Sequence, residues 1–493
     1  MVCKWYVLIY LHWLYKTPYK DGNRLFMIEP IVQSFTRLLP AAALLLLVGC
    51  ASRQEAPPPP VELPSAFSDT GRPTIDQAWW QSFQDEQLNQ LVQQALDSNL
   101  SLKASYQRLR QARAVADRQS AALFPNLDAT AGVERQESET VDATTFSAGL
   151  TASYELDLWG RVQSLSEAEA LRASATLADY QAAAVTLSGE IANTWFQLVA
   201  QRSQRQLAET QLETNQNVLT VIESRFATGQ SSSADVLRQR QLVSASRERL
   251  STIEGDTDVL KHQLSVLLGR SPTRNNLPQD ATLPALPPLP DTGVPAELVQ
   301  RRPDLRRSWL QVQAADEELA AAITDRFPRF SIEASVSSSA SSASELFDNW
   351  LTTLAGNMLV PLIDGGALRA EVRRSRAVLE ERVQQYGQSV LTAIQEVEDA
   401  LVRERQQRQR LQSLQNQIQL ADSTYQQLRS QYLNGTVSYI EVLTALKDKQ
   451  DLQRTILSTR QQLLTTRVAL YRALAGSIEA AEATQETTEQ EQA

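Results

Sequence analysis

Cysteine and histidine are almost absent from this chain, which holds two of each in 493 residues. The cysteines are Cys3 and Cys50, and one histidine, His262, lies in a long proline-free tract. So few of these side chains exclude a disulfide framework, a Cys/His zinc site within one chain and a conventional histidine-based triad. The sequence also lacks a phosphate-binding loop, a zincin motif and a nucleophile elbow. The residues present therefore predict no cofactor and no metal site.

Long apolar runs are scarce as well. Residues 38–48 form an apolar run of 11 residues that follows Arg37. This run is too short to cross a membrane as a helix and is typical of the core of a signal peptide. It ends in the sequence LVGC at residues 47–50, which resembles a bacterial lipobox. Ala51 and Ser52 follow in place of the Asp that typically retains lipoproteins at the inner membrane, which favours the outer membrane.

These features predict how the mature chain begins. Residues 1–49 are expected to be a signal peptide, and Met27 is the more plausible true start. Cys50 is expected to carry a covalent lipid as the first mature residue. Residues 50–75 would then form a lipid-anchored linker, because a flexible proline run occupies residues 57–60.

Basic residues are fewer than acidic ones, with 47 Lys and Arg against 57 Asp and Glu, which gives a formal net charge of −10. The tail at residues 477–493 is acidic and rich in Gln, Glu and Thr. Such a balance argues against nucleic-acid binding, and such a tail is predicted to be disordered.

Two long stretches almost lack proline and glycine. Residues 160–226 and 366–434 contain no proline, and their only internal glycines are Gly189 and Gly387. Each stretch could form one helix of roughly 100 Å at about 1.5 Å per residue. The stretches that follow carry apolar residues at seven-residue spacing, which is typical of a coiled-coil seam: Val236, Val243, Leu250, Ile253, Leu260 and Leu267, then Ile456, Leu463 and Leu470.

The end of each long stretch carries the same short pattern, so the chain is an internal duplication. Residues 224–237 resemble residues 430–443, which lie 206 positions further on. In both copies a glycine is placed to end one helix, and a serine followed three residues later by an acid is placed to begin the next. The pattern predicts two helical hairpins, with their tips at Gly229, Ser232 and Asp235 and at Gly435, Ser438 and Glu441.

Four other segments alternate apolar with small or polar residues, which predicts strands. They lie within residues 127–157 and 329–362, and each is about ten residues long, the length of a tilted membrane-spanning strand. A soluble, half-buried sheet has the same pattern. Four strands cannot close a membrane barrel, whereas three copies of the chain would supply twelve strands.

Several motifs, in this order along the chain, resemble the outer membrane factor family of TolC-like channels. The resemblance is to its lipoprotein branch, the NodT-type components of resistance-nodulation-division efflux systems, and covers almost everything from Cys50 to Gly476. The motifs are WWQSFQDEQL at residues 79–88, FP at 124–125 and 327–328, YELDLWGR at 154–161 and, most specifically, ELVQRRPDL at 297–305.

The resemblance implies an α+β membrane protein that assembles as a homotrimer. Three copies would share a twelve-stranded β-barrel in the bacterial outer membrane and a tube of α-helical hairpins crossing the periplasm. The chain would not be an enzyme but a passive exit duct for small molecules or drugs, served by an inner-membrane pump and a periplasmic adaptor. Two alternatives stay open: a channel for type I protein secretion, and a lipid-anchored periplasmic coiled-coil scaffold.

The resemblance also implies segment boundaries. These are the signal peptide (1–49), linker (50–75), first-repeat helices and equatorial region (76–126), strands 1 and 2 (127–157), first hairpin (158–270), equatorial linker and second-repeat helices (271–328), strands 3 and 4 (329–362), second hairpin (363–476) and tail (477–493).

The resemblance places a periplasmic gate at the hairpin tips. Asp235 and Glu441 fall on acidic positions inside the channel, and Tyr432 on a tyrosine that links neighbouring helices in the closed state. Val437 and Thr444 stand where the family has a linking arginine and a second acid, so the network here is expected to be thinner or rearranged. The two acids can equally be helix caps. The adaptor is expected to contact the tips at Gly229, Gly435, Ser232 and Ser438.

Overall fold

The computed structural model describes residues 61–72, 74, 77–140, 142–272 and 282–478. The chain divides into two units, Met1–Glu55 and Ala56–Ala493, and all of the described residues belong to the second. The predicted signal peptide, Cys50, the proline run and most of the acidic tail lie outside the described residues.

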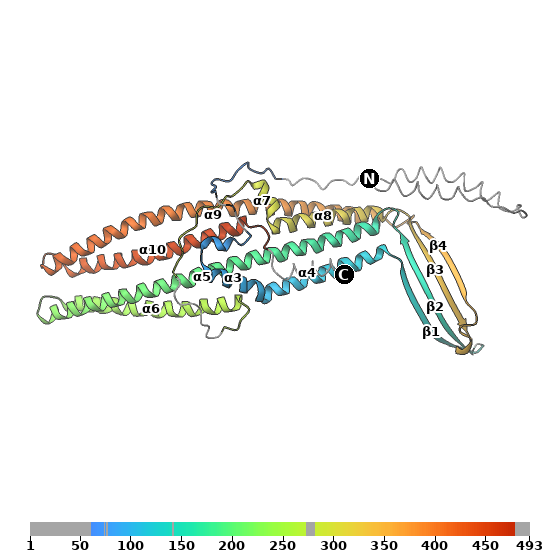
Figure 1. Ribbon diagram of the computed structural model, residues 1–493, viewed down its shortest axis with the longest axis horizontal. Coiled ribbons are helices and arrows are strands. Elements are labelled where there is room, and N and C mark those ends of the chain that lie inside the picture. The colour runs from blue at the N-terminus through green and yellow to red at the C-terminus, as the bar shows by residue number, and fades with distance from the viewer. Residues whose placement is uncertain (1–60, 73, 75–76, 141, 273–281, 479–493) are drawn as a thin grey trace, which may run out of the picture. The chain divides into compact units, whose positions relative to one another are not determined.

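Two helical hairpins of matching length dominate this second unit (Figure 1). In the first, α5 (Arg161–Ala227) is followed by α6 (Ser233–Leu267); in the second, α9 (Ala367–Leu433) is followed by α10 (Tyr439–Leu474). Both α5 and α9 have 67 residues, so each is about 100 Å long. The predicted long helices and the duplication are confirmed. Among the described residues, no helix is apolar over a length that could cross a membrane.

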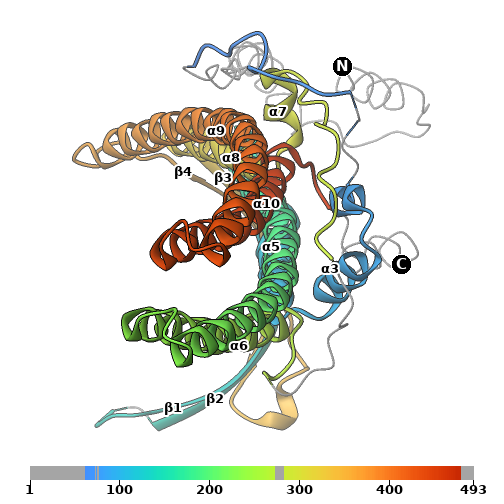
Figure 2. The same cartoon turned by 90° about the vertical axis from the view of Figure 1, so that its left-hand side faces the viewer.

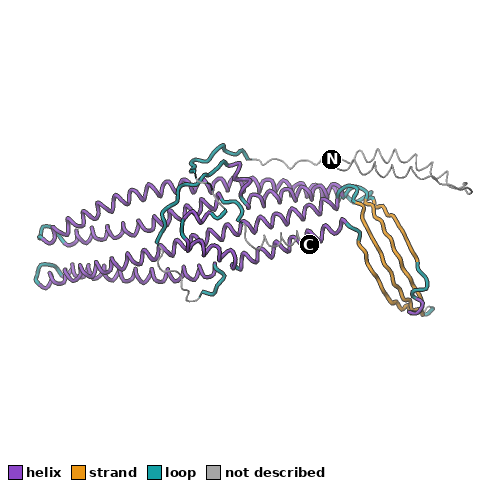
Figure 3. Tube along the Cα trace, in the orientation of Figure 1, coloured by secondary structure: helices purple, strands orange, loops and turns teal. Residues whose placement is uncertain are grey.

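The four predicted strands, orange in Figure 3, form one antiparallel sheet in the order β1-β2-β3-β4 (Figure 1). They are β1 (Asn126–Glu137), β2 (Asp142–Leu156), β3 (Arg329–Ala340) and β4 (Leu351–Leu359). Leu150 pairs with both Ala129 and Val336, which places apolar side chains on one face. Strands β1 and β4 are the edges, so each has one side that is unpaired within the described part of a single chain.

Shorter helices complete the unit. They are η1 (Trp79–Phe83), α3 (Glu86–Ser98), α4 (Leu100–Ser120), η2 (Ala121–Leu123), α7 (Pro295–Arg301), α8 (Pro303–Thr324) and η3 (Ala343–Glu345). Helix α4 contacts α5, α5 contacts α8, and α8 contacts α9. The two repeats therefore lie side by side and meet where α5 packs on α8 (Figure 2).

The main apolar core lies where η1 and α3 pack on α5 and α10. Trp79 stacks on Tyr471 with 5.7 Å between ring centroids, and both are buried. Trp195 is fully buried, and its indole nitrogen donates to Asp85 at 2.7 Å. Asp85 also accepts two backbone hydrogen bonds at the start of α3, so one carboxylate both caps a helix and satisfies a buried indole.

The RRPD motif at residues 301–304 spans the end of α7 and the start of α8. Pro303 occupies the first turn, as predicted, where its missing N–H is not needed. The Arg302 guanidinium bonds Asp304 at 2.7 Å and Glu396 on α9 at 2.8 Å. Burial acts to raise the pKa of Asp304, but the hydrogen bonds and charge of Arg302 outweigh it and leave that pKa below its usual range. The motif therefore joins α8 to α9.

A second arginine is buried deeper. Arg467 of α10 is fully buried and donates to both carboxylate oxygens of Glu404 on α9, at 2.6 and 2.8 Å. Its remaining terminal nitrogen donates to the carbonyls of Pro287 and Pro288, each at 2.6 Å. This ion pair fixes the irregular segment 282–294 against the second hairpin.

The described part of the N-terminal linker runs along that same irregular segment. The Gly71 amide donates to the Pro290 carbonyl at 2.9 Å, and the Thr70 hydroxyl donates to Asp291 at 3.1 Å. A side chain at Gly71 would place its Cβ 1.6 Å from the Leu289 carbonyl oxygen, so only glycine fits. Residues 61–72 are thereby held beside the helices.

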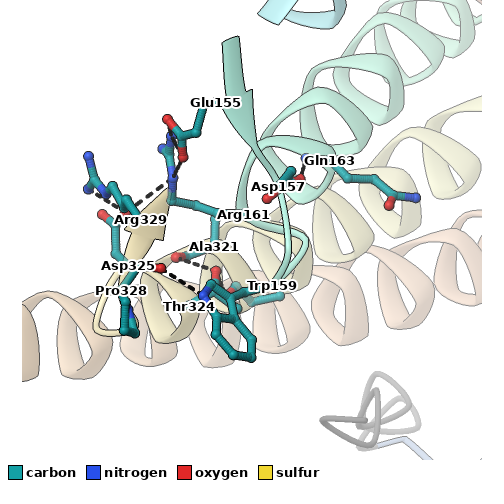
Figure 4. A network of polar contacts seen from close by, with 11 residues as sticks. Glu155, Asp157, Trp159, Arg161, Gln163, Ala321, Thr324, Asp325, Pro328 and Arg329 are labelled. Atoms are coloured by element: carbon teal, nitrogen blue, oxygen red, sulfur yellow. Dashed lines mark hydrogen bonds and ion pairs between the residues drawn. The ribbon is translucent and has the colours of Figure 1, made fainter. Parts of the chain in front are cut away.

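A polar network joins the sheet to the helices (Figure 4). Arg161, the first residue of α5, makes a two-pronged bond to Glu155 of β2 and lies 3.6 Å from Asp325 at the end of α8. Arg329 of β3 bonds the same Asp325 at 2.7 Å. The Trp159 indole donates to the Pro328 carbonyl at 2.7 Å. These contacts fix the point where the first repeat leaves the sheet and the second enters it.

Candidate functional site

The first hairpin tip is the turn between α5 and α6. Gly229 has a left-handed backbone with φ of 76°, which glycine adopts without steric cost. Asp235 accepts a hydrogen bond from the Ser232 amide at 3.1 Å, and the Ser232 hydroxyl accepts one from the Asp235 amide at 3.2 Å. The predicted capping box is confirmed. Arg238 lies 3.4 Å from the same carboxylate.

The second tip, between α9 and α10, repeats this arrangement. Gly435 has φ of 75°. Glu441 accepts hydrogen bonds from the Ser438 amide at 3.1 Å and from the Ser438 hydroxyl at 2.9 Å. A capping box is therefore present here too. In one chain, Asp235 and Glu441 both serve as helix caps.

Tyr432, in the last turn of α9, connects the two tips. Its hydroxyl lies 2.7 Å from that of Ser231 in the first tip, and the tyrosine is 9% exposed. The Arg225 guanidinium lies 4.8 Å from the centre of the Tyr432 ring. Among the described residues of one chain, Tyr432 thus meets a serine and an arginine of the first hairpin. A bond from Tyr432 to a carboxylate of another copy stays a prediction.

A second tyrosine strengthens this connection. Tyr439, the first residue of α10, packs on Tyr432 with 5.6 Å between ring centroids and donates to the Gln239 side chain of α6. Burial is the main reason why the pKa of Tyr439 lies far above its usual range, and the nearby Tyr432 and Asp235 add to the effect. The hydroxyl therefore stays protonated and available as a donor.

The tips enclose a groove of about 540 Å³. Most of the predicted tip residues line it, on both sides: Gly229, Ser232, Asp235, Tyr432, Gly435 and Ser438. Glu441 instead lines a separate groove of about 590 Å³ between α9 and α10, with Thr444 and Asp448. The structure therefore brings the two tips together but places the two predicted gate acids in different grooves of one chain.

The two positions that depart from the family pattern have ordinary local roles. Val437 packs against the apolar cluster around Tyr432 and Tyr439. The Thr444 hydroxyl donates to the Ile440 carbonyl one turn earlier at 2.8 Å. Neither position adds an ion pair among the described residues, so the tip connection here is largely neutral and aromatic.

Further along the helices from the tips, a layer of buried amide side chains joins the two hairpins. Gln450 of α10 donates to the Asn215 side chain of α5 at 3.0 Å, and Asn215 donates to Ser246 of α6 at 2.8 Å. Gln239 donates to the Asn215 carbonyl at 2.6 Å, and Gln211 to the Gln450 carbonyl at 3.2 Å. All four amides are 5% exposed or less. Such buried polar layers fix the register between helices.

Sequence reasoning missed Ser231, Gln239, Tyr439 and this amide layer. One signal was available for Gln239, which lies three residues after Val236 and four before Val243 and so occupies a seam position. Ser231 and Gln239 each have a partner on the second hairpin, about 200 positions away, and a periodic pattern does not reveal it.

The contacts between the two tips are individually weak. Two rigid hairpins are joined at their tips by neutral hydrogen bonds and ring contacts, each worth about 0.5–1.5 kcal/mol. Contacts of this size can be broken by a binding partner without unfolding either hairpin.

Comparisons with known proteins agree with this architecture. Residues 91–270 and 294–476 match the outer membrane efflux protein family. The chain is 32% identical over 471 residues to the pyoverdine export outer membrane protein OpmQ of Pseudomonas aeruginosa, covering 90% of this chain and 97% of that protein. It is 27% identical to the cation efflux system protein CusC of Escherichia coli K12, covering 89% of this chain and 99% of that protein.

A solved structure shares the fold. The outer-membrane channel OprN superposes with a TM-score of 0.79 at 26% identity, covering 86% of this chain and 99% of that chain. Long paired helices and a four-stranded sheet are therefore the parts of a known channel architecture, which removes the periplasmic scaffold as an explanation. The family is one of channels and not of enzymes. The chain belongs to the outer membrane efflux protein family and is an efflux channel component of the outer membrane.

Proposed function

We propose that three copies form one passive exit channel, with a shared twelve-stranded barrel and a tube of six hairpins. The observation that carries this proposal is the open four-stranded sheet, whose outer strands β1 and β4 each have an unpaired side in one chain. An open edge cannot lie in hydrocarbon, and four strands are too few to close. Because strand direction alternates, β4 of one copy would run antiparallel to β1 of the next.

The channel is proposed to act with a periplasmic adaptor and an inner-membrane pump on small molecules. Relatives of similar identity are named for pyoverdine export, cation efflux and toluene efflux, so the names support small-molecule efflux without singling out one compound. None of these names concerns protein secretion, which makes small-molecule efflux the better supported alternative. The tip groove, with Gly229, Ser232, Gly435 and Ser438, is the proposed adaptor contact.

The gate is proposed to be the contact between tips. Changing Tyr432 to Phe removes the hydroxyl that meets Ser231 and no apolar surface. Losing one such bond in each of three copies, at about 0.5–1.5 kcal/mol each, should raise single-channel conductance in planar bilayers. Ser231→Ala should have the same effect.

Tyr425→Phe is the matched control. Tyr425 belongs to the same helix and apolar cluster as Tyr432, and the Lys449 ammonium lies over its ring as the Arg225 guanidinium lies over that of Tyr432. Asp235→Ser then separates gating from capping. If Asp235 is only a cap, this variant loses up to about 1 kcal/mol of stability with unchanged conductance. Unchanged conductance in the Tyr432→Phe and Ser231→Ala variants would show that this contact between the tips does not keep the channel closed.

Cys50 is proposed to carry a diacylglyceryl group that anchors the mature N-terminus. The proposal rests on the lipobox at residues 47–50 directly after the apolar run. We expect Cys50→Ser to abolish metabolic labelling with fatty acid, with the unchanged chain as the positive control. Labelling that persists in Cys50→Ser would rule out this anchor.

A further inference from the structure

The end of α9 nearest the sheet carries an exposed row of arginines. Arg369, Arg373 and Arg376 are spaced by four and three residues, so they lie on one face of the helix, which we call the arginine face. All three are exposed, and no ion pair joins any of them to an acid among the described residues. Only residues 360–366 separate β4 from α9, so the arginine face lies just outside the membrane-spanning sheet.

The start of α5 indicates which way the arginine face points. Arg161, the first residue of α5, bonds Glu155 of β2 at 2.8 Å. Glu155 lies an odd number of residues from Leu150 on that strand, so it points away from the apolar face and toward the channel. The duplication places Ala367 at the start of α9, where Arg161 stands in α5. At about 100° per residue, the three arginines lie roughly 180–240° around the helix from Ala367, on the lipid side.

Charge is balanced on the channel side of α9 but not on the arginine face. Arg374 lies two turns after Ala367, on the same side of the helix, and bonds Glu371 at 2.6 Å. On the other side, Asp364 accepts two backbone amides at the start of the helix. Glu380 lies one turn beyond the last of the three arginines, and no ion pair joins the two among the described residues. The arginine face therefore has positive charge to spare.

Exposed apolar residues lie between the sheet and the arginine face. Leu354 and Met358 of β4 are exposed, and Met358 pairs with Phe330 on the apolar face of the sheet. The chain then continues through Leu362 and Ile363, which are 87% and 96% exposed. Apolar side chains followed by a row of arginines match the boundary between acyl chains and charged headgroups in a membrane.

We propose that the arginine face of α9 binds anionic phospholipid in the periplasmic leaflet of the outer membrane. Guanidinium groups make two-pronged, charge-assisted hydrogen bonds to phosphate, and the acyl chains would lie beside Leu362 and Ile363. The inference goes beyond the proposed channel function and does not depend on the number of copies. The proposed adaptor contact lies at the other end of α9, about 100 Å away, and so leaves this face free for lipid.

The first repeat lacks this face and provides a comparison within the chain. The matching positions of α5 are Gln163, Glu167 and Ala170, none of which is basic. Gln163 donates to Glu167 at 2.9 Å, so the two side chains there satisfy each other. We therefore expect one anionic lipid site for each chain, on the second repeat alone.

Native mass spectrometry of the full chain tests the site, with phosphatidylglycerol and phosphatidylethanolamine of the same acyl chains as probes. The wild type should bind phosphatidylglycerol in preference. The triple variant Arg369→Gln, Arg373→Gln and Arg376→Gln should lose affinity for phosphatidylglycerol by about fivefold for each arginine, because each basic residue near an anionic lipid surface contributes about that factor. The corresponding triple change to Lys keeps the charge and should keep most of the preference.

The matched control changes three other exposed arginines of α9, which lie toward the tips, to Gln: Arg405, Arg410 and Arg429. This variant should bind phosphatidylglycerol like the wild type. The inference is wrong if the wild type shows no preference, if the first triple variant keeps its affinity, or if the control loses as much. Displacement of the lipid by an equal concentration of inorganic phosphate would indicate a site for free anions and would also overturn it. A mass of one copy would contradict the trimer but leave this comparison intact, since each chain carries its own arginine face.

Discussion

Replacing Glu404 with Ala should destabilise the folded chain by about 3–5 kcal/mol, because it leaves the charge of Arg467 buried without its carboxylate. Arg467 is fully buried and Glu404 is 3% exposed. After the change, the guanidinium would keep the carbonyls of Pro287 and Pro288 and its place over the Tyr471 ring, 5.8 Å from the ring centre, but no opposite charge. Helical signal followed against denaturant, at one protein concentration, measures the loss.

Asp399→Ala is the matched control on the same helix, with the same change of charge. Its partner Arg403 lies 3.5 Å away, and the two side chains are 47% and 69% exposed. Exposed pairs contribute about 0–1 kcal/mol, so this variant should unfold almost like the wild type. If Asp399→Ala lost as much free energy of unfolding as Glu404→Ala, burial of the ion pair would not be the cause of the loss.

Replacing Leu150 with Arg should block assembly in the membrane. Leu150 lies on the apolar face of β2, is 49% exposed in one chain and pairs with Val336. A charge facing lipid near the midplane costs about 2–4 kcal/mol per copy, and a ring of three copies repeats it three times. The amount of heat-modifiable oligomer in outer membrane fractions measures the effect.

Thr151→Arg is the control, because Thr151 is the next residue of the same strand and points to the opposite face. It should assemble nearly as well as the wild type. A defect in Thr151→Arg as large as that in Leu150→Arg would contradict a sheet with one lipid face and one channel face.

Local patterns predicted the parts of this fold that local chemistry determines. The proline-free stretches, the glycines at 229 and 435 and the two capping boxes depend on neighbours in sequence, and the structure places them as expected. The alternation that predicted the strands is equally local, and its weakest case, around residues 350–360, gives the shortest strand.

The contacts that join distant segments could not be predicted in this way. Tyr432 was identified by resemblance, but its partner in the chain is Ser231, about 200 positions earlier. Glu404 and Arg467 appear in sequence as ordinary charges on long polar helices, and only packing of α9 against α10 shows that both are buried. Periodicity indicates which side of a helix is covered but not by what.

The copy number of the detergent-solubilised protein tests the central claim most directly. Native mass measurement of the full chain should give three copies, because only three four-stranded sheets supply the proposed twelve-stranded barrel. A mass of one copy, in protein that still conducts ions across a planar bilayer, would contradict a barrel shared by three chains.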